Sequence, residues 1–114
     1  MNTSRSPTIT ISEGELTAVI DGEFDMPATF AIEPALERAL EAPGLRRFTL
    51  DLSGLTFIDS VGIGVVIRLA ADLEERGVPF RIVPGPRHVH RVFTTVGMDQ
   101  LLPFEPESAE STSG

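Results

Sequence analysis

The stretch that decides the fold is residues 51–66, DLSGLTFIDSVGIGVV. An apolar strand pattern leads into Asp59 and Ser60, and a helical pattern that contains Gly62 and Gly64 follows directly. Asp and Ser are preferred N-cap residues, because their side-chain oxygens accept hydrogen bonds from the free N–H groups of the first helical turn. Either Asp59 or Ser60 can therefore cap this helix. The two glycines lack side chains, so we expect the first turn to be open to close approach by another molecule.

Strands and helices alternate on both sides of this stretch. The helix after Asp59 is predicted over 60–76, where Gly77 ends it, and residues 22–25 (Gly-Glu-Phe-Asp) are predicted as a loop. Further strands are predicted at 8–12, 15–20, 47–52, 55–58 and 80–83, further helices at 31–41 and 87–96, and a last short strand or helical turn at 101–104. Pro34 fits the first of these helices only in its first turn, since proline has no N–H group. The alternation predicts an α/β fold, with a central, mostly parallel sheet of four to five strands, an N-terminal hairpin and three to four helices.

The chain of 114 residues has the length of about one domain. Residues 1–7 are polar and are predicted to form a flexible leader, and residues 8–104 are predicted to form the folded domain. Residues 105–114 consist of Glu, Ser, Thr, Pro and Gly with one Ala. This acidic tail is predicted to be disordered, because it has almost no apolar side chain to bury.

The composition argues against several classes of function. The formal net charge of −8 disfavours nucleic acid and anionic membranes as direct partners. Cysteine is absent, and His88 and His90 diverge by about 200° on a helix, so no metal or other cofactor is expected. No nucleophile–base pair indicates an enzyme. The N-terminus has no apolar signal region, and the longest apolar-rich stretch, 61–71, is too short to span a bilayer, which favours a cytoplasmic protein.

Residues 57–66, FIDSVGIGVV, resemble the STAS domain family of anti-sigma-factor antagonists. Members carry an apolar strand, then Asp-Ser-x-Gly, then a small or apolar helix start. Two further features support the resemblance: the Gly-Glu-apolar-Asp segment at 22–25, and the apolar ending at 92–102. The resemblance covers residues 8–104 and implies a single STAS-like α/β domain.

The resemblance also implies a switch at Ser60. In the family, the serine of Asp-Ser-x-Gly is phosphorylated by a partner, an anti-sigma-factor serine kinase that binds ATP. The unphosphorylated antagonist binds this kinase and releases the sigma factor, and phosphorylation abolishes binding. A phosphatase, here expected to be of the PP2C type, restores the antagonist. By position, the phosphorylated residue is Ser60, with Asp59 beside it and Asp25 near it.

Two alternatives stand beside this interpretation. Ser60 can be a plain helix cap, since serine is common at that position. The chain can also be a non-switching adaptor of the same fold, a subunit of a stress-sensing or lipid-transport assembly. One departure from the family pattern bears on the partner: the segment between Asp25 and Pro34 is about one helical turn longer than is common, which predicts a reshaped loop near Ser60.

A helical projection of residues 60–76 predicts a second part of the partner surface. At about 100° per residue, the apolar face that we expect in the core is made of Ile63, Val66, Ile67, Leu69, Ala70 and Leu73. Val61 and Val65 fall on the polar side beside Arg68, where they are either scattered surface residues or a docking surface. The predicted partner-binding residues are Asp25, Asp59, Val61, Gly62, Gly64, Val65 and Arg68. Phosphate at a helix N-terminus is compatible with the helix dipole, so phosphorylation should act on binding rather than on folding.

Overall fold

The main sheet has four strands, and the structure, a computed structural model, describes residues 7–106. The strands lie in the order β1 (Thr8–Ser12), β2 (Glu15–Val19), β4 (Arg47–Asp51) and β6 (Phe80–Val83). The β1–β2 hairpin is antiparallel, and the β2–β4 and β4–β6 pairs are parallel. The turn residues of the hairpin, Glu13 and Gly14, have φ values of 53° and 82°, as tight hairpin turns require. The predicted α/β domain with a mostly parallel sheet and an N-terminal hairpin is confirmed.

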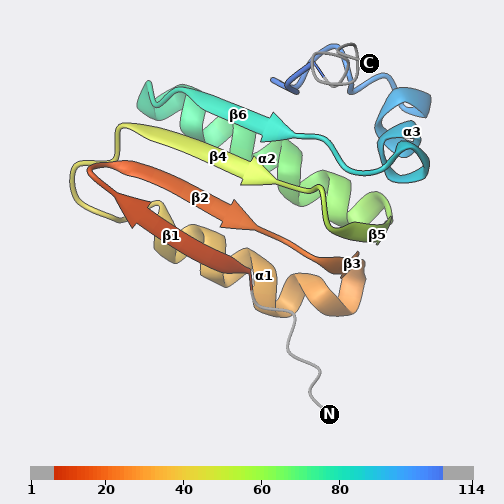
Figure 1. Cartoon of the computed structure of the whole chain (residues 1–114), viewed down its shortest axis with the longest axis horizontal. Coiled ribbons are helices and arrows are strands. Elements are labelled where there is room, and N and C mark those ends of the chain that lie inside the picture. The colour runs from red at the N-terminus through yellow and green to blue at the C-terminus, as the bar shows by residue number, and fades with distance from the viewer. Residues whose placement is uncertain (1–6, 107–114) are drawn as a thin grey trace, which may run out of the picture.

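A second, two-stranded sheet lies beyond the ends of β2 and β4 (Figure 1). It consists of β3 (Gly22–Phe24) and β5 (Leu55–Ile58), which run parallel. The prediction of a loop at 22–25 is therefore wrong for its first three residues, and Asp25 is the N-cap of the next helix. A three-residue strand is too short to show the alternation by which strands are recognised in a sequence.

Two helices, α1 (Met26–Ala39) and α2 (Ser60–Arg76), lie on the same face of the main sheet, and a third, α3 (Arg87–Thr95), lies at the end near β5 (Figure 1). The sheet face toward α1 and α2 is apolar, because alternate residues of each central strand point there. Its fully buried side chains are Leu16 and Ala18 of β2, Phe48 and Leu50 of β4, and Ile82 of β6. Burial of this layer holds the helices on the sheet.

The first helix begins at Met26, whereas the sequence had predicted a start at Ala31. Asp25 caps it and Pro27 lies in its first turn, where proline is well tolerated. Pro34 consequently lies inside the helix and not in the first turn. The predicted reshaped loop after Asp25 is wrong for the same reason: the residues that follow Asp25 are helical and belong to α1.

The second helix spans 60–76 and ends at Gly77, which has a φ of 70°, as predicted. Its exposure pattern differs at two positions. Val65, placed on the exposed side by the projection, is only 3% exposed, and Ile67, placed in the core, is 38% exposed. The reason is that α2 packs against α1 as well as against the sheet, which rotates its buried face toward α1.

The chain after α3 returns to the edge of the main sheet. Phe104 forms an isolated parallel bridge with Ile82 of β6, within the stretch predicted as a short strand or helical turn. The next residue, Glu105, forms an ion pair with Arg81 at 2.7 Å. Of the predicted leader and tail, Pro7, Glu105 and Pro106 belong to the described residues, and the rest lies outside them.

Candidate functional site

The candidate site lies where α1 and α2 begin (Figure 1). The parallel strands β3 and β5 end side by side, with Phe24 paired to Ile58. The next residues, Asp25 and Asp59, are the N-caps of α1 and α2, with nearly identical extended backbones. The parallel pairing thus brings two helix N-termini and two carboxylates to one edge of the protein.

The Asp59 carboxylate connects the two helix starts. Its Oδ1 accepts hydrogen bonds from the N–H groups of Val61 and Gly62, at 3.0 Å each. Its Oδ2 accepts one from the N–H group of Met26, the first residue of α1, at 3.2 Å. One side chain therefore satisfies three backbone donors in two helices, and its negative charge lies at the positive ends of both helix dipoles.

Asp25 has the corresponding role in α1 alone. Its Oδ1 accepts a hydrogen bond from the N–H group of Ala28 at 3.1 Å. The buried Thr29 completes this turn, because its hydroxyl donates to the carbonyl oxygen of Met26 at 2.7 Å. Asp25 and Asp59 thus cap two helices that begin side by side, and the side-chain contacts that they make are with backbone N–H groups.

Ser60 is exposed and is the first residue of α2, one position after the cap. The open choice between Asp59 and Ser60 as the cap is therefore decided in favour of Asp59. Within residues 7–106, the Ser60 hydroxyl forms no hydrogen bond. The interpretation of Ser60 as a plain helix cap is wrong, since Asp59 makes the cap bonds and Ser60 is exposed to solvent.

The two glycines of the motif differ in their surroundings. Gly62 is buried, and a Cβ atom there would overlap the carbonyl oxygen of Phe24 and lie 3.0 Å from Cγ1 of Ile58. The close approach that Gly62 permits is that of α2 to β3, which contradicts the expected opening toward another molecule. At Gly64 the nearest atom to such a Cβ is Nη1 of Arg68, at 3.7 Å, so this position does have room.

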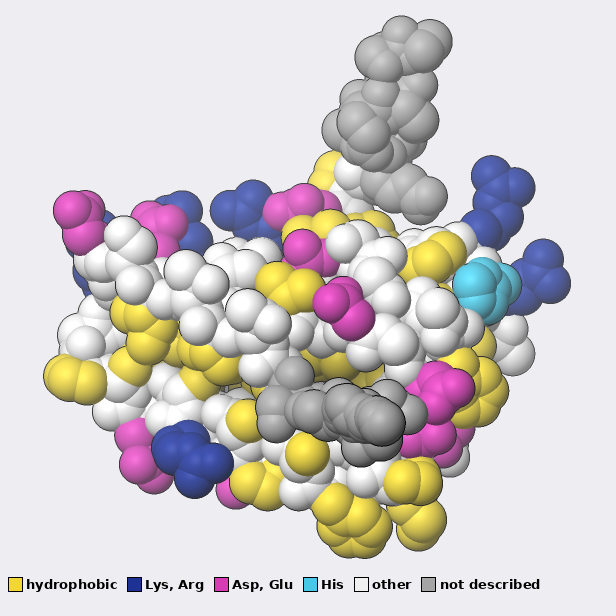
Figure 2. All heavy atoms as spheres, turned by 60° about the horizontal axis from the view of Figure 1, so that its bottom comes forward, with side chains coloured by type: hydrophobic (Ala, Val, Ile, Leu, Met, Phe, Trp, Pro, Cys, Tyr) yellow, Lys and Arg dark blue, Asp and Glu magenta, His cyan; other side chains and the backbone are white. Residues whose placement is uncertain are grey.

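Four exposed apolar side chains, called the apolar patch below, come from the start of α1, the end of β5 and the start of α2. Its members are Met26, Phe30, Phe57 and Val61, of which Phe30 is 78% exposed and Val61 37%. Phe57 and Val61 lie three residues before and one residue after Ser60, and Met26 is bonded to Asp59. Figure 2 shows hydrophobic side chains at the surface near acidic ones toward the right-hand end, where β3, β5 and the start of α1 lie in Figure 1. Exposed apolar groups gathered near one functional group are typical of interaction surfaces.

Three members of the apolar patch were missed by the sequence interpretation: Met26, Phe30 and Phe57. A signal for the first two was present. Asp25 followed by Pro27 is a helix-start pattern, and it makes Met26 and Phe30 neighbours one turn apart. Because the predicted helix began only at residue 31, the sequence did not place Met26 and Phe30 on one helix.

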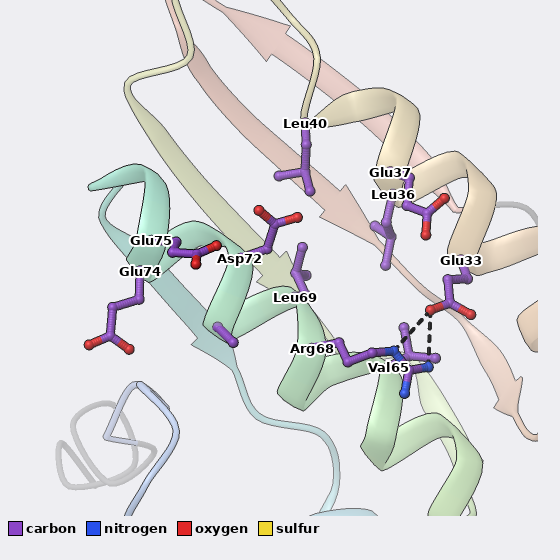
Figure 3. Close-up of a pocket in the computed structure, with 11 residues that line it drawn as sticks. Glu33, Leu36, Glu37, Leu40, Val65, Arg68, Leu69, Asp72, Glu74 and Glu75 are labelled. Atoms are coloured by element: carbon purple, nitrogen blue, oxygen red, sulfur yellow. Dashed lines mark hydrogen bonds and ion pairs between the residues drawn. The ribbon is translucent and has the colours of Figure 1, made fainter.

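The predicted docking surface on α2 is only partly formed. Val61 and Gly64 have exposed surface, whereas Val65 is buried against α1. Arg68 lies two turns from Ser60 and is paired with Glu33 of α1 at 3.0 Å (Figure 3). The residues that gather at the start of α2 are therefore Asp25, Asp59, Ser60, Val61 and Gly62, with Arg68 apart from them.

The described part of the chain contains no group of three or more His, Asp or Glu residues placed to hold a metal ion. Among the helices in residues 7–106, none is long and apolar enough to cross a membrane.

A protein-family model described as the STAS domain matches residues 6–111. The chain belongs to the STAS domain family. This confirms the resemblance that the Asp59–Ser60 motif had indicated.

Three relatives illustrate the similarity, each at 18–23% sequence identity. The chain is 23% identical over 91 residues to the anti-sigma F factor antagonist of Paenibacillus polymyxa, which covers 80% of this chain and 78% of that protein. It superimposes on an anti-sigma factor antagonist from Mycobacterium paratuberculosis with a TM-score of 0.78 at 23% identity, over 94% of this chain and 90% of that one. For the phosphorylated form of the Bacillus cell fate determinant SpoIIAA, the TM-score is 0.66 at 18% identity, over 94% and 97% of the two chains. The solved structures share the STAS fold.

Substituting the two motif glycines should have opposite effects on stability. We expect Gly62→Ala to lower the free energy of unfolding by about 1–3 kcal/mol, because its methyl group overpacks the contact with β3. Gly64→Ala should leave stability unchanged or raise it by up to about 1 kcal/mol, because alanine favours an exposed helix. Urea denaturation followed by circular dichroism measures both. Equal midpoints for the two variants would contradict the assigned packing of Gly62.

Proposed function

We propose that this protein is an anti-sigma-factor antagonist that works by partner switching. Its unphosphorylated form binds an anti-sigma-factor serine kinase and thereby releases the sigma factor, and phosphorylation of Ser60 abolishes this binding. The observation that carries the proposal is the Ser60 hydroxyl, which is exposed and free of hydrogen bonds within residues 7–106 because Asp59 caps α2. Relatives of this chain that are anti-sigma-factor antagonists support the same role.

The position of Ser60 suits a phosphate group that alters binding without unfolding the domain. The hydroxyl contributes nothing to the cap, so modifying it breaks no described hydrogen bond of α2. A phosphate adds about −1.5 to −2 charges at neutral pH. The residue that carries it lies in the chain between Asp59, which has a carboxylate, and Val61, which has an apolar side chain. A partner that covers the apolar patch would have to bury this charge, which is costly unless the partner supplies a matching cation.

The role proposed for this chain is binding rather than catalysis. In this scheme the kinase binds ATP and supplies the catalytic groups that transfer its phosphate to Ser60. A PP2C-type phosphatase removes this phosphate. Both steps take place in the cytoplasm. Ser60 needs no neighbouring base of its own, because it is the substrate of another enzyme. The solved phosphorylated form of SpoIIAA shows that one relative of this fold carries such a modification.

Modification at Ser60 should control binding to the kinase. With its kinase and ATP, the wild-type protein should be phosphorylated at Ser60, as mapped by mass spectrometry, and Ser60→Ala should remain unmodified and still bind. Ser60→Asp should bind at least about tenfold more weakly, a loss of about 1.4 kcal/mol, in calorimetry.

The matched control for Ser60→Asp is Ser12→Asp, which adds the same charge at the opposite end of the main sheet. It should bind the kinase as the wild type does. Phosphate on another residue, or unchanged binding of Ser60→Asp, would contradict partner switching, and the second result would favour the non-switching adaptor.

The apolar patch should contribute to the same binding. Phe30→Ala should weaken kinase binding by about tenfold or more, because large aromatic side chains are common hot spots. Stability should change by less than about 0.5 kcal/mol, since Phe30 is 78% exposed. Ile11→Ala on β1 is the control, because Ile11 is a large apolar residue that is 51% exposed and lies on another element. Equal affinities of the two variants would exclude the patch from the interface.

A further inference from the structure

A groove of about 740 Å³ runs between α1 and α2 and opens to solvent (Figure 3). The side chains of Leu36 of α1, its C-cap Leu40, and Val65 and Leu69 of α2 point into the space between the helices and form the floor of the groove. Each of these side chains is at most 5% exposed, so the floor offers a narrow aliphatic strip rather than a broad apolar face. An occupant therefore needs to gain most of its affinity from the rim of the groove.

The rim of the groove is acidic. Glu33 is paired with Arg68 at 3.0 Å, and Asp72 with Arg76 at 2.8 Å. The remaining carboxylates of the rim, those of Glu37, Glu74 and Glu75, form no ion pair or side-chain hydrogen bond within residues 7–106. The groove thus carries an uncompensated negative charge, in a chain whose net charge is already −8.

The groove is held open by contacts along its length. Asp59 joins the two helices at their N-terminal end through Met26, and Arg68 joins them in the middle through Glu33. At the other end, Nη1 of Arg76 donates a hydrogen bond to the carbonyl oxygen of Leu40 at 3.1 Å. A surface fixed in this way needs little rearrangement to bind, which lowers the entropic cost of association.

We propose that this groove binds a basic helix of a partner protein. A third helix can lie along the two that form the groove, as helices do when their side-chain ridges pack into grooves. Its Lys or Arg side chains would place their aliphatic stems on the Leu and Val floor and their charged ends beside Glu37 and Glu75. This surface goes beyond the proposed function, because neither Ser60 nor the apolar patch lines it.

A second copy of the chain fits the groove poorly. Among the helices of the described part of the chain, the one with a basic exposed face is α3, which carries Arg87 and Arg91. The apolar side of α3, with Val89 and Phe93, is already buried in its own core. Two copies would also bring net charges of −8 together.

The experiment uses the full-length protein and a fluorescein-labelled amphipathic Leu/Lys helical peptide of about four turns, followed by fluorescence anisotropy. A peptide of the same composition in scrambled order measures general attraction to an acidic protein. We expect the helical peptide to bind at least about tenfold more tightly than the scrambled one. Equal affinities would overturn the proposal, as would self-association of the protein through the groove in ultracentrifugation.

Two double variants distinguish the effect of the groove on peptide binding from the effect of the overall charge. Glu37→Lys/Glu75→Lys reverses the rim, and Glu13→Lys/Asp99→Lys makes the same change of charge outside the groove. The rim variant should weaken binding of the helical peptide at least about tenfold, and the control variant less than about threefold. Ala71→Phe, at an exposed position that lines the groove, should also weaken binding by filling it. Equal losses in the two double variants, or no effect of Ala71→Phe, would contradict docking in the groove, whatever the result for Ser60.

Discussion

The structure of the site depends on the hydrogen bonds of one carboxylate, that of Asp59. It accepts the N–H groups of Val61 and Gly62 in α2 and, across 33 residues of sequence, that of Met26 in α1. Both helices begin at the same edge because β3 and β5 are parallel and end together. Without Asp59, two helix N-termini would lie side by side with unsatisfied donors and like partial charges. The carboxylate converts this repulsion into an attraction that positions both helices.

This arrangement explains how a serine beside a helix cap can serve a second purpose. Because Asp59 satisfies the first turn, the hydroxyl of Ser60 has no structural role within the described residues and can be modified without loss of the cap. Gly62 contributes by letting α2 approach the backbone of β3, which keeps the motif at the surface edge. Stability and signalling are therefore assigned to different residues of the same short motif.

The sequence predicted the long, regular elements well and the short ones poorly. The 60–76 helix, its Gly77 end and the parallel strands follow from periodicity and capping, and the Asp-Ser-x-Gly pattern located the site. Strand β3 is too short for periodicity to show, and its omission hid the start of α1 and the exposure of Phe30. Val65 was misplaced because a projection of one helix does not include its neighbour. The groove between α1 and α2 was not foreseeable, since it depends on the spacing of two helices that only the tertiary structure fixes.

The most direct test of the central role of Asp59 is amide hydrogen exchange, measured by NMR in the wild type and in Asp59→Ala. We expect faster exchange at Val61 and Gly62 and also at Met26. Ala28, whose N–H group is bonded to Asp25, should keep its protection and serves as the internal control. Faster exchange at Val61 and Gly62 with no change at Met26 would show that Asp59 caps α2 alone, and would contradict the coupling of the two helices.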